Sequence, residues 1–235
     1  MADKAQFVQN MSFDDAEYLV FRLEGVREPE SLARLLDMLK HRILVDLSPS
    51  LDECYSLGPY TVFDGANRET HYWGNLLHRS KYLGDKSAGE VLLNHIEGFI
   101  ETHLPIRTVD TVIAAPKTDR RTPDMPGTWV EFLAERRGWT RAQAFKAPTS
   151  GAQKSIQSNQ EELELVERMK NTITISDVSP NSRVLIVDDT IRSGGTLIEI
   201  ARELRANGVS EVYGVTVAKD ARMTYGGVDL NKEAW

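Results

Sequence analysis

The chain has 235 residues, of which 41% are hydrophobic and 27% charged, and these proportions are ordinary for a globular protein. A formal net charge of -7 argues against a protein that coats nucleic acid, and the single cysteine, Cys54, excludes an intramolecular disulfide and a cysteine-rich zinc ribbon within this chain. The first twenty residues are acidic without a long apolar core, and no apolar run approaches the span of a membrane, so we expect a cytoplasmic protein without a signal peptide.

The first half of the chain is expected to contribute helices and two strands. Residues 29–44 place leucines on one helical face, and residues 60–65 have the composition of a strand that ends in a turn. Residues 75–104 are interpreted as a helical turn, a Gly-Asp loop and a second helix with a buried stripe. The short apolar run at residues 109–116 predicts a strand that is covered on both faces.

The second half of the chain begins with a long polar region, from residue 117 to about residue 180. Helices are expected near residues 127–139 and 159–171, separated by a loop rich in Ser, Gly and Lys. Residues 183–189, 196–208 and 211–219 then predict a strand, a helix and another strand. So short a connection predicts parallel strands joined by a right-handed crossover.

Two adjacent acids, Asp188 and Asp189, end the strand at residues 183–189. The ligand crevice of an open parallel sheet lies beyond the carboxyl ends of its strands. Two neighbouring carboxylates at such a place are costly unless a partner meets them, and vicinal hydroxyls, a metal ion or metal-bound water would serve. Two other interpretations are a solvated strand end and the acidic pocket of a receiver domain, although a receiver usually has its acid pair near the start of the chain.

The residues after the acids combine hydroxyl groups with glycines at the start of a helix: Thr190, Ile191, Arg192, Ser193, Gly194, Gly195 and Thr196. Glycines let backbone amides approach an anion closely, and a helix start leaves amides unpaired and carries partial positive charge. Alone, this segment would be an ordinary helix start with Thr196 as its cap. Beside the two acids it predicts a phosphate cradle next to a diol site, as ribose 5-phosphate requires.

The stretch VLIVDDTIRSGGT, residues 184–196, resembles the phosphoribosyl-pyrophosphate-binding motif of type I phosphoribosyltransferases. Residues 76–92 resemble the K-Y-x-G-D segment of that family's ComF-like branch, and residues 153–171 resemble a second segment of it, whereas the branch's N-terminal zinc ribbon is missing. The resemblance implies a type I phosphoribosyltransferase-like α/β domain at residues 71–235, with a mostly parallel sheet flanked by helices. Residues 1–70 would form an N-terminal hood or interface segment.

The resemblance also implies roles for individual residues. Asp188 and Asp189 would bind the ribose hydroxyls and hold Mg²⁺, directly or through water, and the loop from Thr190 to Thr196 would bind the 5-phosphate. The loop after the strand at residues 109–116 would bind pyrophosphate through Pro116, Lys117, Thr118 and Arg120. Lys154 would belong to a catalytic lid. For Lys117, Arg120 and Lys154 a solvated loop is the competing interpretation, and Lys81 would either form a salt bridge or belong to the site.

The activity that the resemblance implies is transfer of ribose 5-phosphate from phosphoribosyl pyrophosphate, with Mg²⁺, to an unidentified nucleobase or amine, or its release from a nucleotide monophosphate. The alternative is a non-catalytic accessory protein that senses a nucleotide or phosphoribosyl pyrophosphate, in DNA uptake or nucleotide regulation. Dimers are common in the family, so a homodimer is compatible with this reading. Neither a membrane nor direct nucleic-acid binding is expected.

Overall fold

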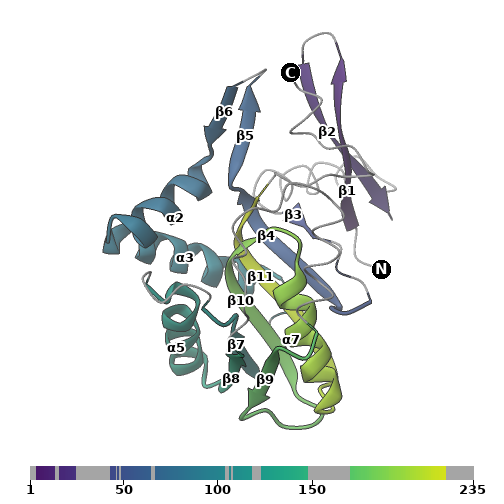
Figure 1. The fold of residues 1–235 in the computed structure, drawn as a ribbon, viewed down its shortest axis with the longest axis vertical. Coiled ribbons are helices and arrows are strands. Elements are labelled where there is room, and N and C mark those ends of the chain that lie inside the picture. The colour runs from purple at the N-terminus through teal and green to yellow at the C-terminus, as the bar shows by residue number, and fades with distance from the viewer. Residues whose placement is uncertain are drawn as a thin grey trace.

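The computed structural model has an α/β fold in which a seven-stranded sheet carries helices on both faces (Figure 1). The residues described are 4–13, 16–24, 43–45, 47, 49–64, 67–103, 106, 108–117, 123–147 and 170–220. No helix within these residues combines the length and the apolar character needed to cross a membrane.

The central sheet has the strand order β3-β4-β11-β10-β7-β8-β9. Its inner strands all run parallel: β4 (Glu53–Pro59), β11 (Glu211–Lys219), β10 (Arg183–Ile191), β7 (Thr111–Ala114) and β8 (Thr140–Lys146). The edge strands β3 (Ile43–Leu44) and β9 (Ile173–Ser176) run antiparallel to their neighbours. The prediction of a mostly parallel sheet flanked by helices is therefore confirmed.

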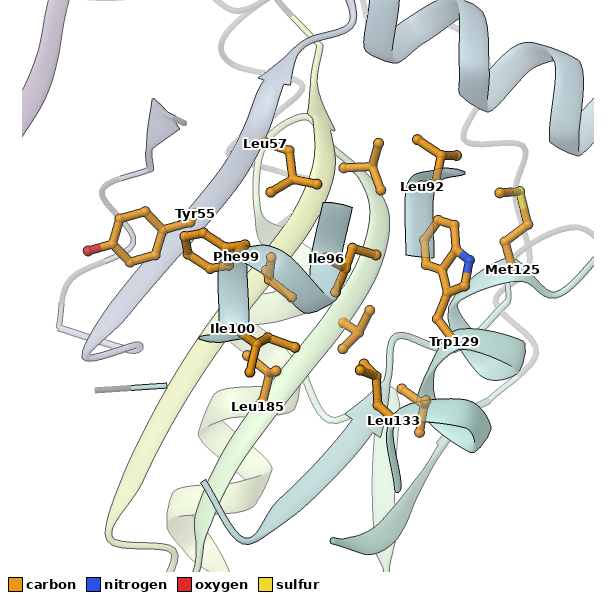
Figure 2. Packing of buried hydrophobic residues seen from close by; sticks show 14 of the residues in the cluster. Tyr55, Leu57, Leu92, Ile96, Phe99, Ile100, Met125, Trp129, Leu133 and Leu185 are labelled. Atoms are coloured by element: carbon orange, nitrogen blue, oxygen red, sulfur yellow. The ribbon is translucent and has the colours of Figure 1, made fainter. Parts of the chain in front are cut away.

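Helices cover the two faces of the sheet unequally. One face is covered by α2 (Tyr72–Tyr82), α3 (Lys86–Thr102) and α5 (Met125–Arg137), and the other by α7 (Gly195–Ala206) (Figure 1). On the first face, Leu185 of β10 belongs to a buried cluster with Phe99 and Trp129 (Figure 2). On the second face, Ile186 of β10 belongs to a cluster with Leu197. Side chains alternate across a strand, so a strand that is covered on both sides must be apolar throughout.

Several predicted elements are confirmed with small changes in their ends, namely the strands β7, β10 and β11 and the helices α2, α3, α5 and α7. The predicted strand at residues 60–65 is β5 (Thr61–Asp64), which forms a hairpin with β6 (Asn67–Thr70). Most of the predicted helix at residues 29–44 lies outside the described residues, and its last two residues, Ile43 and Leu44, form the edge strand β3 instead of a helix. The predicted helix near residues 159–171 lies outside the described residues up to residue 169.

The sequence did not predict β4, β8 and β9 or the hairpin of β1 (Lys4–Phe13) and β2 (Ala16–Glu24). In β4 the residues Glu53, Ser56, Gly58 and Pro59 hide an otherwise buried strand, because polar residues, Gly and Pro are depleted in strands. Both β3 and β4 precede residue 70 and still belong to the main sheet. The domain boundary at residue 70 stays a prediction.

Candidate functional site

The carboxyl edge of the parallel sheet brings together segments that are far apart in the sequence. The last paired residue of β7, Ala114, lies opposite Val187, and the amide of Ala115 donates to the carbonyl of Val187 at 2.9 Å. Pro116 and Lys117 therefore leave the sheet beside Asp188. The acids and the start of the predicted pyrophosphate loop share one edge, whereas Thr118 and Arg120 lie outside the described residues.

The two acids do not end their strand, as the sequence had suggested. Strand β10 continues to Ile191, and Thr190 and Ile191 pair with Ala218 and Lys219 of β11. Successive side chains on a strand point to opposite faces. Asp189 therefore lies on the same face as Leu185, towards α2, α3 and α5, and its partner on α2 confirms this side. Asp188 lies on the face of α7.

Asp188 lies in surroundings that disfavour its charged form. Its Oδ1 accepts a hydrogen bond from the amide of Asp189 at 2.7 Å. Burial, followed by the charge of Asp189, raises the pKa of Asp188 well above its ordinary value, and the hydrogen bond and the charge of Lys81 oppose this change only in part. A cation or a hydrogen-bond donor arriving here would stabilise the charged carboxylate.

Asp189 is already paired with an ammonium group. Lys81, in the last turn of α2, places its Nζ 2.5 Å from Asp189 Oδ2, and the two side chains are 24% and 13% exposed. Burial alone would lower the pKa of Lys81, but the charge of Asp189 and the hydrogen bond to it raise it. Lys81 thus forms the salt bridge that one reading of the sequence expected, and its part in a ligand site stays a prediction.

The predicted phosphate loop has the backbone of a helix start without a side-chain cap. The cap of α7 is Gly194, with φ 78° and no side-chain hydrogen bond, so the alternative with Thr196 as the cap is wrong. The amide of Ile198 makes the first bond of the helix, to the carbonyl of Gly194. Amides of the preceding turn have no carbonyl partner within the helix and are suited to an anion.

The end of strand β11 and the residue after it hold the predicted phosphate loop through hydrogen bonds to its backbone. The Nζ of Lys219, which is 6% exposed, donates to the carbonyl of Arg192 at 3.1 Å, and the amide of Asp220 donates to the carbonyl of Ile191 at 2.9 Å. A buried ammonium group held against the backbone adds positive charge beneath the loop where the 5-phosphate is expected to bind. Ser193 and Gly195 lie in the same turn.

Sequence reasoning missed Lys146 and Lys219, which end β8 and β11 at this edge. Lys146 is half-buried, and burial lowers its pKa while the charge of Asp188 opposes this change. A charged residue at the end of a strand is the signal that could have indicated both lysines, but β8 was not predicted as a strand. Lys154 lies outside the described residues.

The donor set fits Mg²⁺ only together with a ligand. Asp188 and Asp189 supply the oxygen atoms that Mg²⁺ prefers. In the part of the chain that the structure describes, no group of three or more His, Cys, Asp or Glu is placed to hold a metal ion. Ligand oxygens and water would therefore have to complete the coordination, as is usual for Mg²⁺ bound with phosphates.

Two acids and an uncapped helix start at the carboxyl edge of a parallel sheet are the arrangement expected of an α/β protein that binds a phosphorylated ligand. Residues 138–229 match the family model described as the phosphoribosyl transferase domain, and this stretch contains the acids, the loop, α7 and β11. No curated protein sequence matches the chain.

Solved structures similar to this chain include two phosphoribosyltransferases of Leishmania and one of Aeropyrum pernix. Adenine phosphoribosyltransferase of Leishmania donovani is 13% identical with a TM-score of 0.45, and the match covers 81% of this chain and 92% of that one. The enzyme of Leishmania tarentolae is 11% identical with a TM-score of 0.44, covering 77% and 96%. Orotate phosphoribosyltransferase of Aeropyrum pernix is 17% identical with a TM-score of 0.40, covering 80% and 81%.

Proposed function

We propose that this protein is a phosphoribosyltransferase that binds phosphoribosyl pyrophosphate with Mg²⁺ and transfers ribose 5-phosphate to a nucleobase or amine, or runs the reaction in reverse. The observation that supports it best is the shared sheet edge of the two acids and the uncapped start of α7, within the stretch that matches the family model. A diol and a phosphate a few ångströms apart would meet complementary groups at that edge.

Different residues of the site would bind different parts of phosphoribosyl pyrophosphate. Asp188 and Asp189 accept hydrogen bonds from the 2- and 3-hydroxyls of the ribose, and the amides and hydroxyls from Ser193 to Thr196 donate to the 5-phosphate. Lys117, at the exit of β7, offsets the charge of the pyrophosphate, and Pro116 turns the chain beside it. Asp188 and Asp189 would hold Mg²⁺, directly or through water, and the ion would supply charge neutralisation for the leaving group.

The chemical step is a displacement at the anomeric carbon. The bond from that carbon to the pyrophosphate oxygen breaks with its electron pair on the oxygen, a bond to the acceptor nitrogen forms, and the acceptor releases its proton to solvent. The transition state has oxocarbenium character, so little covalent work falls to the protein. Positioning of the ligand and stabilisation of the departing charge are the main contributions of the side chains.

Two measurements test this function on the full chain. Isothermal titration calorimetry with phosphoribosyl pyrophosphate and Mg²⁺ measures binding, and release of pyrophosphate over a panel of nucleobases and amines measures turnover. The double variant Asp188→Asn with Asp189→Asn is expected to bind at least roughly 10- to 100-fold more weakly, because hydrogen bonds to charged groups are lost.

The control is Glu90→Gln, which removes one carboxylate from the exposed face of α3. It is expected to bind as the wild type does, and circular dichroism shows whether each variant is folded. A double variant that binds normally would refute the roles given to the acids. Binding without turnover over the whole panel would instead support the sensing protein, and with it the finer assignment to the ComF-like branch.

A further inference from the structure

An ion pair across the candidate site joins two segments that are distant in the chain. Lys81 reaches Asp189 from α2 over a sequence separation of 108 residues, with Nζ and Oδ2 2.5 Å apart. The hydroxyl of Tyr60 lies in the same field, since the charges of Lys81 and Asp189 both contribute to its pKa after burial, Tyr82 and Asp220. With both of its side chains at least three-quarters buried, the pair differs from exposed pairs, which contribute little.

The amino-terminal end of α2 is held close to β4 and the residue after it. A Cβ at Gly58 would lie 2.1 Å from the indole of Trp73, and a Cβ at Gly74 would lie 2.1 Å from the carbonyl of Tyr60, so helix and strand are in direct contact. Side chains of a well-packed helix have few alternative positions. Lys81 therefore lies on a helix, α2, that is held rigidly against the sheet.

The carboxyl-terminal end of α2 is fixed as well. The amides of Leu83 and Asp85 both donate to the carbonyl of Arg79, at 3.1 Å each. The carboxylate of Asp85 pairs with the guanidinium of Arg79 at 2.5 Å and caps α3 by accepting from Ala88 at 3.1 Å. This joint sets the direction in which the last turn of α2, and with it Lys81, faces the sheet.

Two acids beside a phosphate loop create an electrostatic conflict. A sugar phosphate brings its own negative charge to an edge that already carries Asp188 and Asp189. At a partly buried site such repulsion is screened less than it is between charges in open solvent. Lys81 reduces the repulsion from Asp189, because its ammonium group cancels the charge of that carboxylate at contact distance.

We propose that Lys81 is a positioning residue of the ligand site: it holds the carboxylate of Asp189 and cancels its charge, so that the edge can receive an anionic sugar phosphate. This proposal rests on the proposed function, because it takes the segment from Ser193 to Thr196 as the phosphate site. It adds a residue of α2 to the site, outside the stretch that matches the family model.

The test uses inorganic phosphate as the probe, because phosphate needs the loop but makes no use of a diol. Its dissociation constant is measured without metal by phosphorus NMR titration for the wild type and three variants. Lys81→Met is expected to bind phosphate roughly three- to thirty-fold more weakly, since Asp189 is left uncompensated. Asp189→Asn is expected to bind it more tightly, and the double variant is expected to return close to the wild type.

Two further variants separate charge from structure. Lys81→Arg keeps the positive charge and should bind phosphate nearly as the wild type does, whereas Lys86→Met removes the same charge from the exposed first turn of α3 and should change nothing. A packing role for Lys81 predicts weaker binding in both Asp189→Asn and the double variant. Wild-type affinity in Lys81→Met, or no recovery in the double variant, overturns the proposal while leaving the proposed function intact. A wild type that binds neither phosphate nor phosphoribosyl pyrophosphate overturns both.

Discussion

Replacing Gly194 by alanine is expected to destabilise the start of α7 for two separate reasons. The residue has φ 78°, in the left-handed region, and a Cβ built on it would lie 2.5 Å from Cδ2 of Leu47. The first feature imposes backbone strain on any L-residue, and the second requires Leu47 to move. Leu47 packs against the core under α7, so it has little room to retreat.

The size of the effect follows from the two contributions. A left-handed conformation in a residue with a Cβ costs about 1–2 kcal/mol, and overpacking of a well-packed contact costs about 1–3 kcal/mol. The free energy of unfolding should therefore fall by about 2–5 kcal/mol. For a domain of this size each kcal/mol lowers Tm by roughly 2–4 °C, so a loss of roughly 4–20 °C is expected.

Two glycines of the same chain act as controls in urea unfolding monitored by circular dichroism. Gly84 has φ 67° with no atom within 4 Å of its Cβ position, so Gly84→Ala measures the backbone strain alone. Gly98, inside α3, has neither a left-handed φ nor a close neighbour, and Gly98→Ala should stabilise the protein by about 0.5–1 kcal/mol. If Gly194→Ala is no worse than Gly84→Ala, the contact with Leu47 does not restrict the loop and the reasoning fails.

Three other predictions concern buried groups. Burial raises the pKa of Asp188 above its ordinary 3.8, so the ligand-free fold loses stability as the pH rises through that ordinary value. Asp188→Asn should therefore raise Tm at pH 8 and leave Tm unchanged at pH 3. Equal changes in Tm at the two pH values would contradict this cause. Cys54 is 1% exposed and burial raises its thiol pKa to about 12, so iodoacetamide at pH 8 should label it in urea but not in the folded protein; equal labelling rates would refute its burial. Gly58→Ala should lower stability by about 1–3 kcal/mol through its clash with Trp73, and unchanged urea unfolding would exclude that contact.

The elements that were predicted correctly have hydrophobic patterns that are visible in their own residues. The run from Val184 to Val187 is apolar at every position, as a strand covered on both faces requires, and the structure buries all four residues. The helix α7 shows an apolar stripe with Leu197, Ile200 and Leu204 on its inner side. Local patterns of this kind reflect burial directly, so they were sufficient for the parallel core of the fold.

The features that were missed depend on tertiary contacts. Strand β4 looks polar and contains Gly58 and Pro59, yet its pairing with β11 buries it. No local pattern could have shown that Lys81 meets Asp189, because α2 must first pack on the sheet. The predicted strand also ended two residues early, because Asp188 and Asp189 resemble the start of a loop but belong to β10, which pairs with β11 as far as Ile191.

That continuation of β10 gives the two adjacent acids different environments. Were they in a loop, both carboxylates could turn to one side, whereas in a strand one faces α7 and the other faces α2. Asp188 is enclosed, and its charged form is disfavoured until a cation or donor arrives. Asp189 is paired with the ammonium group of Lys81. The ligand-free edge is therefore less negative than its sequence implies, which reconciles an acidic couplet with a neighbouring helix start suited to phosphate. It follows that the two acids are not interchangeable: removing Asp188 takes away a group that the ligand must ionise, and removing Asp189 leaves an ammonium group without its partner.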